Sequence, residues 1–241
     1  MRLSRHIRWV CSALLLLSQT LYAQKEQLYL FPGQGSDFRI FEALKFDTAR
    51  YEVLAISYPR PDRKDKLSTY AFELIPQLDT SQPFSFIGVS LGGMIAQELC
   101  SSVQPKKVIA ISSITQRKEL PPFYRSQRWL PIYRLFPAGI IKLGSRIAQP
   151  LFEPDRKTFA PLFKSMLKAK DARFLKRAIG MIAGWQPPEH NVPVIHIHGD
   201  KDSTLPIRRT HADHIVQGGS HIMVRTCSIL IQPILDGYLS E

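Results

Sequence analysis

The sequence lacks the features that mark several large classes of protein. Its 241 residues contain three cysteines, and we find no internal repeat and no low-complexity run. No apolar stretch reaches the ~20 residues that a membrane-spanning helix needs. Acidic residues are scarce, since 20 Asp and Glu face 32 Lys and Arg, a net charge of +12. No nucleic-acid-binding motif accompanies this charge, so nucleic acid is not expected as a partner. The length fits one α/β domain with a large core.

The first 23 residues are predicted to be a secretory signal peptide. Three arginines come first, a leucine-rich apolar stretch follows, and a short polar segment leads to Ala23. This is the order found in such peptides, and we expect cleavage after Ala23 and export to the periplasm or the medium. The alternative is an uncleaved N-terminal membrane anchor. Cleavage would leave a net charge of +9 and two cysteines, Cys100 and Cys227, whose positions alone do not imply a disulfide.

After residue 24, short apolar segments alternate with amphipathic ones. Strands are expected at 28–31, 52–58, 84–89, 107–113, 192–198 and 213–216, and helices at 67–78, 91–99 and 223–239, the last interrupted or delayed by Pro233. This alternation predicts an α/β fold, with a mostly parallel sheet flanked by helices, in a single domain over residues 24–241. From about 115 to 190 no strand pattern occurs. The clearest feature there is a helix at 159–183, so we predict an inserted helical cap.

The strongest motif is Gly88-Val89-Ser90-Leu91-Gly92, which matches G-x-S-x-G. It lies between an expected strand and an expected helix, which is the setting of a nucleophile elbow. Ser90 would sit on a strained turn, and the glycines would let the strand and the helix approach each other. The backbone N–H of Leu91 would then be available to bind an oxyanion. The alternative is a structural turn without chemistry.

A serine nucleophile needs a base, and the base needs a carboxylate that orients it. His221 ends a glycine-rich segment after the last expected strand and is the candidate base. Two carboxylates, Asp200 and Asp202, follow the strand at 192–198. Asp200 has a competing role in turn hydrogen bonds, and the pattern alone leaves both residues open.

Two further histidines raise the question of a metal. His196 and His198 alternate along a strand and would share one of its faces. No third ligand stands at a matching spacing, so neither a metal site nor a cofactor is expected.

Three segments together resemble the nucleophile, acid and histidine motifs of the α/β-hydrolase superfamily: GVSLGG at 88–93, HGDKD at 198–202 and GGSH at 218–221. The resemblance extends from about residue 28 to the C-terminus, with the cap matched only in position. It implies an exported serine hydrolase that cleaves a carboxylic ester or thioester through an acyl-enzyme. Ser90 would be the nucleophile, Asp202 the acid and His221 the base. A second oxyanion donor would come from the loop at 31–36, and we assign it to the backbone N–H of Gln34.

The chain departs from the family pattern in two places. Pro32-Gly33 stands where the family often has His-Gly, and the family's leading antiparallel strands are missing from the pattern. A serine nucleophile counts against a dehalogenase or an epoxide hydrolase. Two alternatives remain: the same triad acting on a lactone, an amide or a carbon–carbon bond, and an inactive binding protein that kept the fold.

The positive charge belongs to the predicted cap. Residues 115–190 contain 15 Lys and Arg against 5 Asp and Glu, a net of +10. Six cations lie on the helix expected at 159–183: Lys164, Lys168, Lys170, Arg173, Lys176 and Arg177. They form a solvated lid surface, attract an anionic acyl substrate, or contact an anionic membrane surface, and the sequence leaves these three interpretations open.

Overall fold

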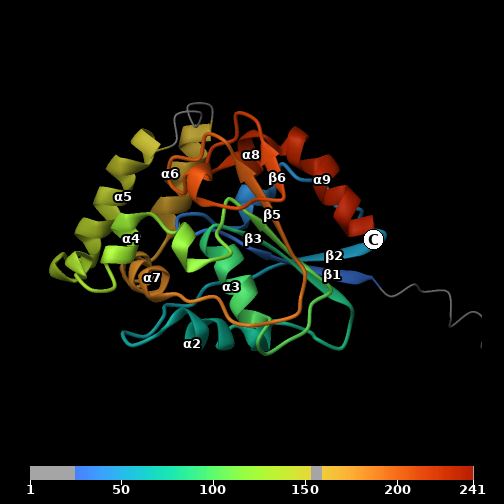
Figure 1. Cartoon of the computed structure of the whole chain (residues 1–241), viewed down its shortest axis with the longest axis horizontal. Coiled ribbons are helices and arrows are strands. Elements are labelled where there is room, and N and C mark those ends of the chain that lie inside the picture. Colours follow the sequence, from blue (N-terminus) through green and yellow to red (C-terminus); the bar gives the residue numbers. More distant parts are fainter. Residues whose placement is uncertain (1–24, 153–158, 241) are drawn as a thin grey trace, which may run out of the picture.

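Six strands form the centre of the protein (Figure 1). The structure is a computed structural model, and it describes residues 25–152 and 159–240. The predicted signal peptide lies outside the described residues. The strands are β1 (Glu26–Phe31), β2 (Tyr51–Ala55), β3 (Phe84–Val89), β4 (Val108–Ile111), β5 (Val194–Gly199) and β6 (His214–Val216). Their order is β2-β1-β3-β4-β5-β6, and every neighbouring pair is parallel, which confirms the predicted sheet.

Helices cover both faces of this sheet because its strands are apolar on both sides. In β1, Tyr29 and Phe31 pack into one cluster, with α2 (Leu67–Phe72), α3 (Leu91–Leu99) and α7 (Ala172–Gly184). Leu28 and Leu30 point to the other face, where they pack with η1 (Phe38–Phe41), α8 (Met223–Thr226) and α9 (Ser228–Ser240). The alternation of side chains along one strand therefore divides the core into two layers.

Between β4 and β5 the described chain forms helices only. These are η3 (Arg117–Glu119), α4 (Pro122–Ser126), η4 (Ile132–Leu135), α5 (Ala138–Phe152), α6 (Ala160–Ala169) and α7. Figure 1 shows α4, α5 and α7 together at one end of the molecule. The segment closes on itself, because the Arg117 guanidinium donates to the carbonyls of Ala183 (3.0 Å) and Trp185 (2.7 Å).

The expected helix at 159–183 is wrong, because the chain forms two helices there. Lys170 is extended (φ −68°, ψ 139°) and ends α6. The Asp171 carboxylate then accepts a hydrogen bond from the Phe174 N–H at 2.8 Å. This is the geometry of an N-cap, which starts a new helix by satisfying a free N–H of its first turn. The six cations predicted to lie on one helix are therefore divided between α6, α7 and the junction between them.

Two other elements end earlier than expected. The second strand stops at Ala55, since both backbone groups of Ser57 pair with the side-chain amide of Gln77 (2.9 Å each) instead of with β1. The helix expected at 67–78 splits into α2 and η2 (Ile75–Gln77). Pro76 has no N–H with which to continue an α-helical ladder.

The closing helix breaks at Cys227 (φ −120°, ψ 28°), whereas Pro233 lies inside α9. Cys227 and Cys100 are both free thiols. In the part of the chain that the structure describes, no helix combines the length and the apolar content needed to cross a membrane.

We predict that Gly92→Ala lowers the free energy of unfolding by about 3 kcal/mol, the upper end of the range for overpacking. A Cβ at Gly92 would collide with the carbonyls of Phe31 and Pro32, which are backbone atoms and cannot rotate away. Gly237→Ala is the matched control. No atom lies within 4 Å of a Cβ built at this helical position, so alanine should stabilise by about 0.5–1 kcal/mol. Urea unfolding measures both, and equal effects would contradict the prediction.

Candidate active site

Ser90 lies on the turn that joins β3 to α3. Its backbone has φ 54° and ψ −118°, a conformation that L-residues rarely adopt. The Ser90 N–H donates to the carbonyl of Ile111 at 3.0 Å, which fixes the turn to the end of β4. A Cβ built on Gly88 would lie 2.5 Å from the carbonyl group of Gly92, so only glycine lets the strand and the helix meet this closely. The sequence motif thus forms the elbow that it predicts.

His221 connects this serine to an acid. Its Nε2 lies 2.9 Å from the Ser90 Oγ, and its Nδ1 lies 2.8 Å from the Asp202 Oδ2. We assign the ring proton to Nδ1, because the carboxylate can only accept. The other oxygen of Asp202 accepts from the N–H groups of Thr204 (2.9 Å) and Leu205 (2.7 Å). The structure therefore brings the three predicted triad residues into one hydrogen-bonded chain.

The surroundings keep Asp202 ionised although its side chain is fully buried. Burial alone would raise the pKa of this carboxyl. The positive charge that His221 can carry and the hydrogen bonds from His198 and His221 outweigh burial and hold the pKa well below its usual range. A permanently charged acid can orient the imidazole and stabilise the cation that forms when His221 takes a proton.

Asp200, the competing carboxylate, has a structural role. Its Oδ1 accepts from the Gly218 N–H at 2.7 Å, while the Lys201 N–H donates to the Gly219 carbonyl at 2.9 Å. These bonds join the loop after β5 to the loop that precedes His221. The Asp200 carboxylate thus bonds across to a second loop instead of within its own turn, and it holds together the two loops that carry Asp202 and His221.

The loop after β1 lies against the serine. A Cβ built on Gly33 would lie 3.5 Å from the Ser90 Cβ, and the Gly33 N–H is bound to the Ser36 Oγ at 2.9 Å. The side chain of Gln34 donates to the Leu175 carbonyl of α7 at 2.8 Å. Leu91 is the first residue of α3, where a helix has no internal acceptor for its N–H groups. Both predicted oxyanion donors, the N–H groups of Gln34 and Leu91, are thus next to Ser90 in the fold or in the chain.

Two buried histidines, His196 and His198, lie beside Asp202, and the sequence alone gave no role for them. The His198 Nε2 lies 2.7 Å from the Leu205 carbonyl and 3.3 Å from the Asp202 Oδ2, and its Nδ1 lies 3.1 Å from the His196 Nε2. The His196 Nδ1 faces the His211 carbonyl at 3.2 Å. Two neutral imidazoles supply two N–H groups for these contacts. Three contacts share these two protons, so one of the three is made without a proton between its atoms.

This pair contacts the acid loop, because the His198 Nε2 lies 3.3 Å from the Asp202 Oδ2. Among the described residues, no group of three His, Cys, Asp or Glu side chains is placed to hold a metal ion. The sequence contained one signal for the position of this pair. The spacing His-x-His before Gly-Asp-Lys-Asp places both imidazoles on one face of the strand, beside the loop that carries Asp202.

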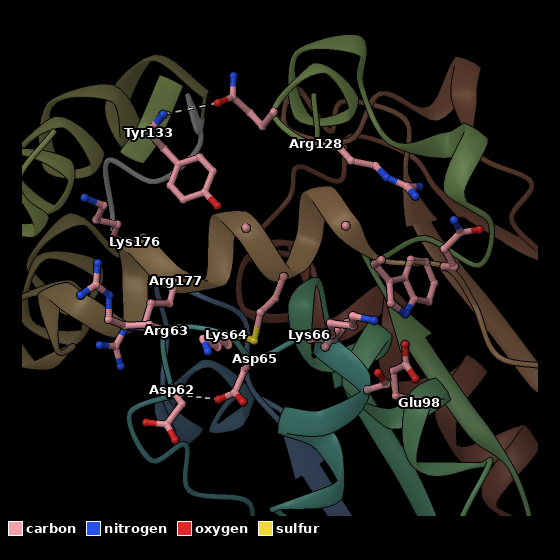
Figure 2. A pocket seen from close by; sticks show the side chains of 18 of the residues that line it. Asp62, Arg63, Lys64, Asp65, Lys66, Glu98, Arg128, Tyr133, Lys176 and Arg177 are labelled. Atoms are coloured by element: carbon pink, nitrogen blue, oxygen red, sulfur yellow. Dashed lines mark hydrogen bonds between the residues drawn. The ribbon is translucent and has the colours of Figure 1, made fainter. Parts of the chain in front are cut away.

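A cleft of about 1660 Å³ lies between the cap and the segment at residues 62–68 (Figure 2). None of the five predicted site residues lines it. Figure 2 shows cationic side chains from separate segments around it, among them Arg63, Lys64 and Lys66 before α2 and Lys176 and Arg177 on α7. Five of the fifteen cap cations, namely Arg128, Arg134, Arg173, Lys176 and Arg177, therefore line a cleft that does not include Ser90.

Two cations of the predicted lid surface have structural roles, so the solvated interpretation fails for them. The Lys170 Nζ lies 5.5 Å and 5.4 Å from the ring centres of Tyr58 and Phe174, and burial lowers the pKa of this amine. The Lys176 Nζ donates to the carbonyls of Arg134 (3.1 Å) and Phe136 (2.6 Å). Neutralising either residue would disturb the packing of the cap.

Comparisons with known proteins agree with this geometry. A family model described as a thioesterase domain matches residues 26–114, which hold β1 to β4 and the elbow. No curated protein sequence matches the chain.

Solved structures match nearly the whole fold. A hydrolase from Pseudomonas aeruginosa PA01 has a TM-score of 0.69 at 16% identity, with 91% of each chain covered. The enol-lactonase from Burkholderia xenovorans LB400 has a TM-score of 0.68 at 12% identity, covering 92% of this chain and 94% of that one. An esterase from Exiguobacterium antarcticum has a TM-score of 0.66 at 14% identity, covering 90% and 93%. At these identities the similarity is one of fold.

We predict that acid destabilises the fold through His196. Burial, followed by the neighbouring His198, lowers the pKa of His196. Below about pH 6.5, the ordinary imidazole value, the unfolded chain then binds more protons than the folded protein. The free energy of unfolding should fall as the pH drops from 7.5 to 5, by up to about 1.4 kcal/mol per pH unit from this group.

His196→Gln should reduce that slope, as urea unfolding at several pH values would measure. Comparison with the wild type cancels the contribution of the titrating groups that lie far from His196. Identical slopes for the two proteins would contradict the prediction.

Proposed function

We propose that this member of the α/β-hydrolase superfamily is a serine hydrolase that cleaves a carboxylic ester or thioester through an acyl-enzyme. The observation that carries the proposal is the hydrogen-bonded chain from the Ser90 Oγ through His221 to Asp202, with distances of 2.9 and 2.8 Å. A serine hydroxyl becomes nucleophilic when a base accepts its proton, and this chain supplies the base and its orienting acid.

Two half-reactions follow from this arrangement. The Ser90 Oγ attacks the acyl carbon while its proton moves to the His221 Nε2. The carbonyl oxygen becomes an oxyanion, to which the N–H groups of Leu91 and Gln34 would donate hydrogen bonds. The tetrahedral species expels an alcohol or thiol, which takes the proton from His221. Water then attacks the acyl-serine, His221 again accepts and returns a proton, and the carboxylic acid leaves.

The substrate class rests on the family match and on the charge. The thioesterase match covers the elbow, and a solved esterase structure resembles the fold of the chain, so a small-molecule ester or thioester is the first choice. A lactone is the second, because an enol-lactonase shares the fold and the same attack would open its ring. The net charge of +10 over residues 115–190 favours substrates that carry an anionic group.

The proposal predicts different losses from the two neighbouring aspartates. Asp202→Asn should lower kcat by up to ~10⁴-fold, because the imidazole loses its orienting charge. Asp200→Asn is the matched control, with the same change two residues away, and it should cost far less in kcat. Ser90→Ala should abolish turnover. Hydrolysis of acyl esters and thioesters of increasing chain length, with and without anionic head groups, measures these effects.

Labelling with a fluorophosphonate separates an enzyme from an inactive binding protein. The wild type should react and Ser90→Ala should not. Absence of labelling in a folded wild type would refute the proposal. A larger kcat loss in Asp200→Asn than in Asp202→Asn, with both folded, would show that the acid is misassigned.

We also propose export, which rests on the order of residues 1–23 alone. The full chain, expressed in a bacterium with a general secretory pathway, should lose this segment. Mass spectrometry of the exported protein should then find Gln24 as the first residue. A chain that stays intact in the membrane fraction would favour the N-terminal anchor instead.

A further inference from the structure

The face of the cap formed by residues 123–147 is unusually apolar for a surface. Nine of the fifteen exposed large hydrophobic side chains of the described residues fall in this segment. Trp129 and Leu135 are 82% and 80% exposed, more than most residues of any kind. Scattered single apolar residues need no explanation, but a contiguous group on one structural unit marks an interaction surface.

Helix α5 makes this face regular. Ile140, Leu143 and Ile147 recur at i, i+3 and i+7 and so form a stripe along one side of the helix, and all are exposed. Apart from the backbone of α5 itself, no atom of the described residues lies within 4 Å of a Cβ built on Gly144, which lies on the same side. The opposite side of α5 contacts the rest of the cap, because the Lys142 Nζ donates to two carbonyls at the end of α6 (2.7 and 2.6 Å). The apolar stripe of α5 thus points away from the protein.

The charge of this segment has one sign. Between residues 120 and 152 the sequence has five Lys and Arg and no Asp or Glu. Arg128, Arg134 and Arg146 are exposed in this segment, and the first two also line the cleft of about 1660 Å³. The Arg128 guanidinium lies 5.3 Å from the ring centre of Trp129, which places an apolar ring and a cation at one point of the surface. Tryptophan beside arginine is typical of side chains at the boundary between lipid headgroups and acyl chains.

We propose that this face, residues 123–147, docks the protein on a bilayer that contains anionic lipid. The apolar side chains would enter the headgroup boundary while the arginines contact the lipid phosphates. A second copy of the chain fits less well. A symmetric dimer would place the same arginines opposite each other, with no carboxylate in the segment to neutralise them. This docking goes beyond the proposed hydrolysis and does not depend on it.

Vesicle sedimentation of the full chain tests the proposal. Binding to phosphatidylcholine vesicles with 30% phosphatidylglycerol should exceed binding to pure phosphatidylcholine by about tenfold or more, since each arginine near an anionic surface adds roughly fivefold. The triple variant I140S/L143S/I147S should lose about tenfold or more of this binding. The matched control is I229S/L230S on α9, where both side chains are also exposed. Figure 1 shows α9 and α5 at opposite ends of the molecule, so the control should bind like the wild type.

A local probe removes the contribution of residues 1–24, which are present in every variant. An environment-sensitive dye is attached to a cysteine at position 143 (L143C), with Cys11 and Cys227 replaced by serine. Its emission should shift to the blue on anionic vesicles, whereas the same dye at position 229 (I229C) should not respond.

Three results would overturn the proposal. The first is equal binding of the triple variant and the wild type. The second is an unchanged dye at position 143 on vesicles that bind the chain. The third is a vesicle-free dimer that the triple variant abolishes, which would make a second copy the partner. Hydrolysis of a soluble ester by the triple variant should match the wild type, so a failure of docking and a failure of the proposed chemistry can be told apart.

Discussion

Ser90 occupies a backbone conformation, φ 54° and ψ −118°, that an L-residue leaves unless its surroundings hold it there. Several parts of the fold keep Ser90 in this conformation. The end of β4 accepts the Ser90 N–H, and Gly92 lets α3 lie against the carbonyl of Phe31. Because the strands are parallel, the loops after β1, β3, β5 and β6 meet at one sheet edge, and these loops carry Gln34, Ser90, Asp202 and His221.

The acid and the histidine are positioned by backbone contacts more than by their own side chains. Gly199 packs against the backbone of Gly219, and Asp200 ties the same two loops together through the Gly218 N–H. Asp202 then has both oxygens occupied, one by two backbone N–H groups and one by His221. Such saturation leaves the carboxylate a single orientation, and the buried pair His196 and His198 closes the space behind it. These hydrogen bonds therefore stabilise the negative charge of Asp202 in the core.

The parts that sequence predicted well are those governed by local rules. Strand β3 and helix α3 have the expected bounds, since the glycines and the apolar run around Ser90 leave little choice. The division between α6 and α7 was missed because the apolar spacing continues across Asp171, and only its capping bond reveals the break. The roles of Lys170 and Lys176 could not be predicted, since Tyr58 and Arg134 are distant in the chain and a cation looks the same in sequence whether it is solvated or packed.

The contact between Gln34 and the cap has an evolutionary consequence. The Gln34 side chain binds the backbone carbonyl of Leu175 and no side chain of α7. Any amino acid that preserves the path of the helix can offer the same carbonyl. Lineages could thus replace most of the cap, and with it the surface shown to substrates and membranes, while the loop beside Ser90 kept its anchor. If caps were exchanged between distant relatives, a change in the position of this helix should disrupt the contact with Gln34 more readily than a change in the sequence of the helix.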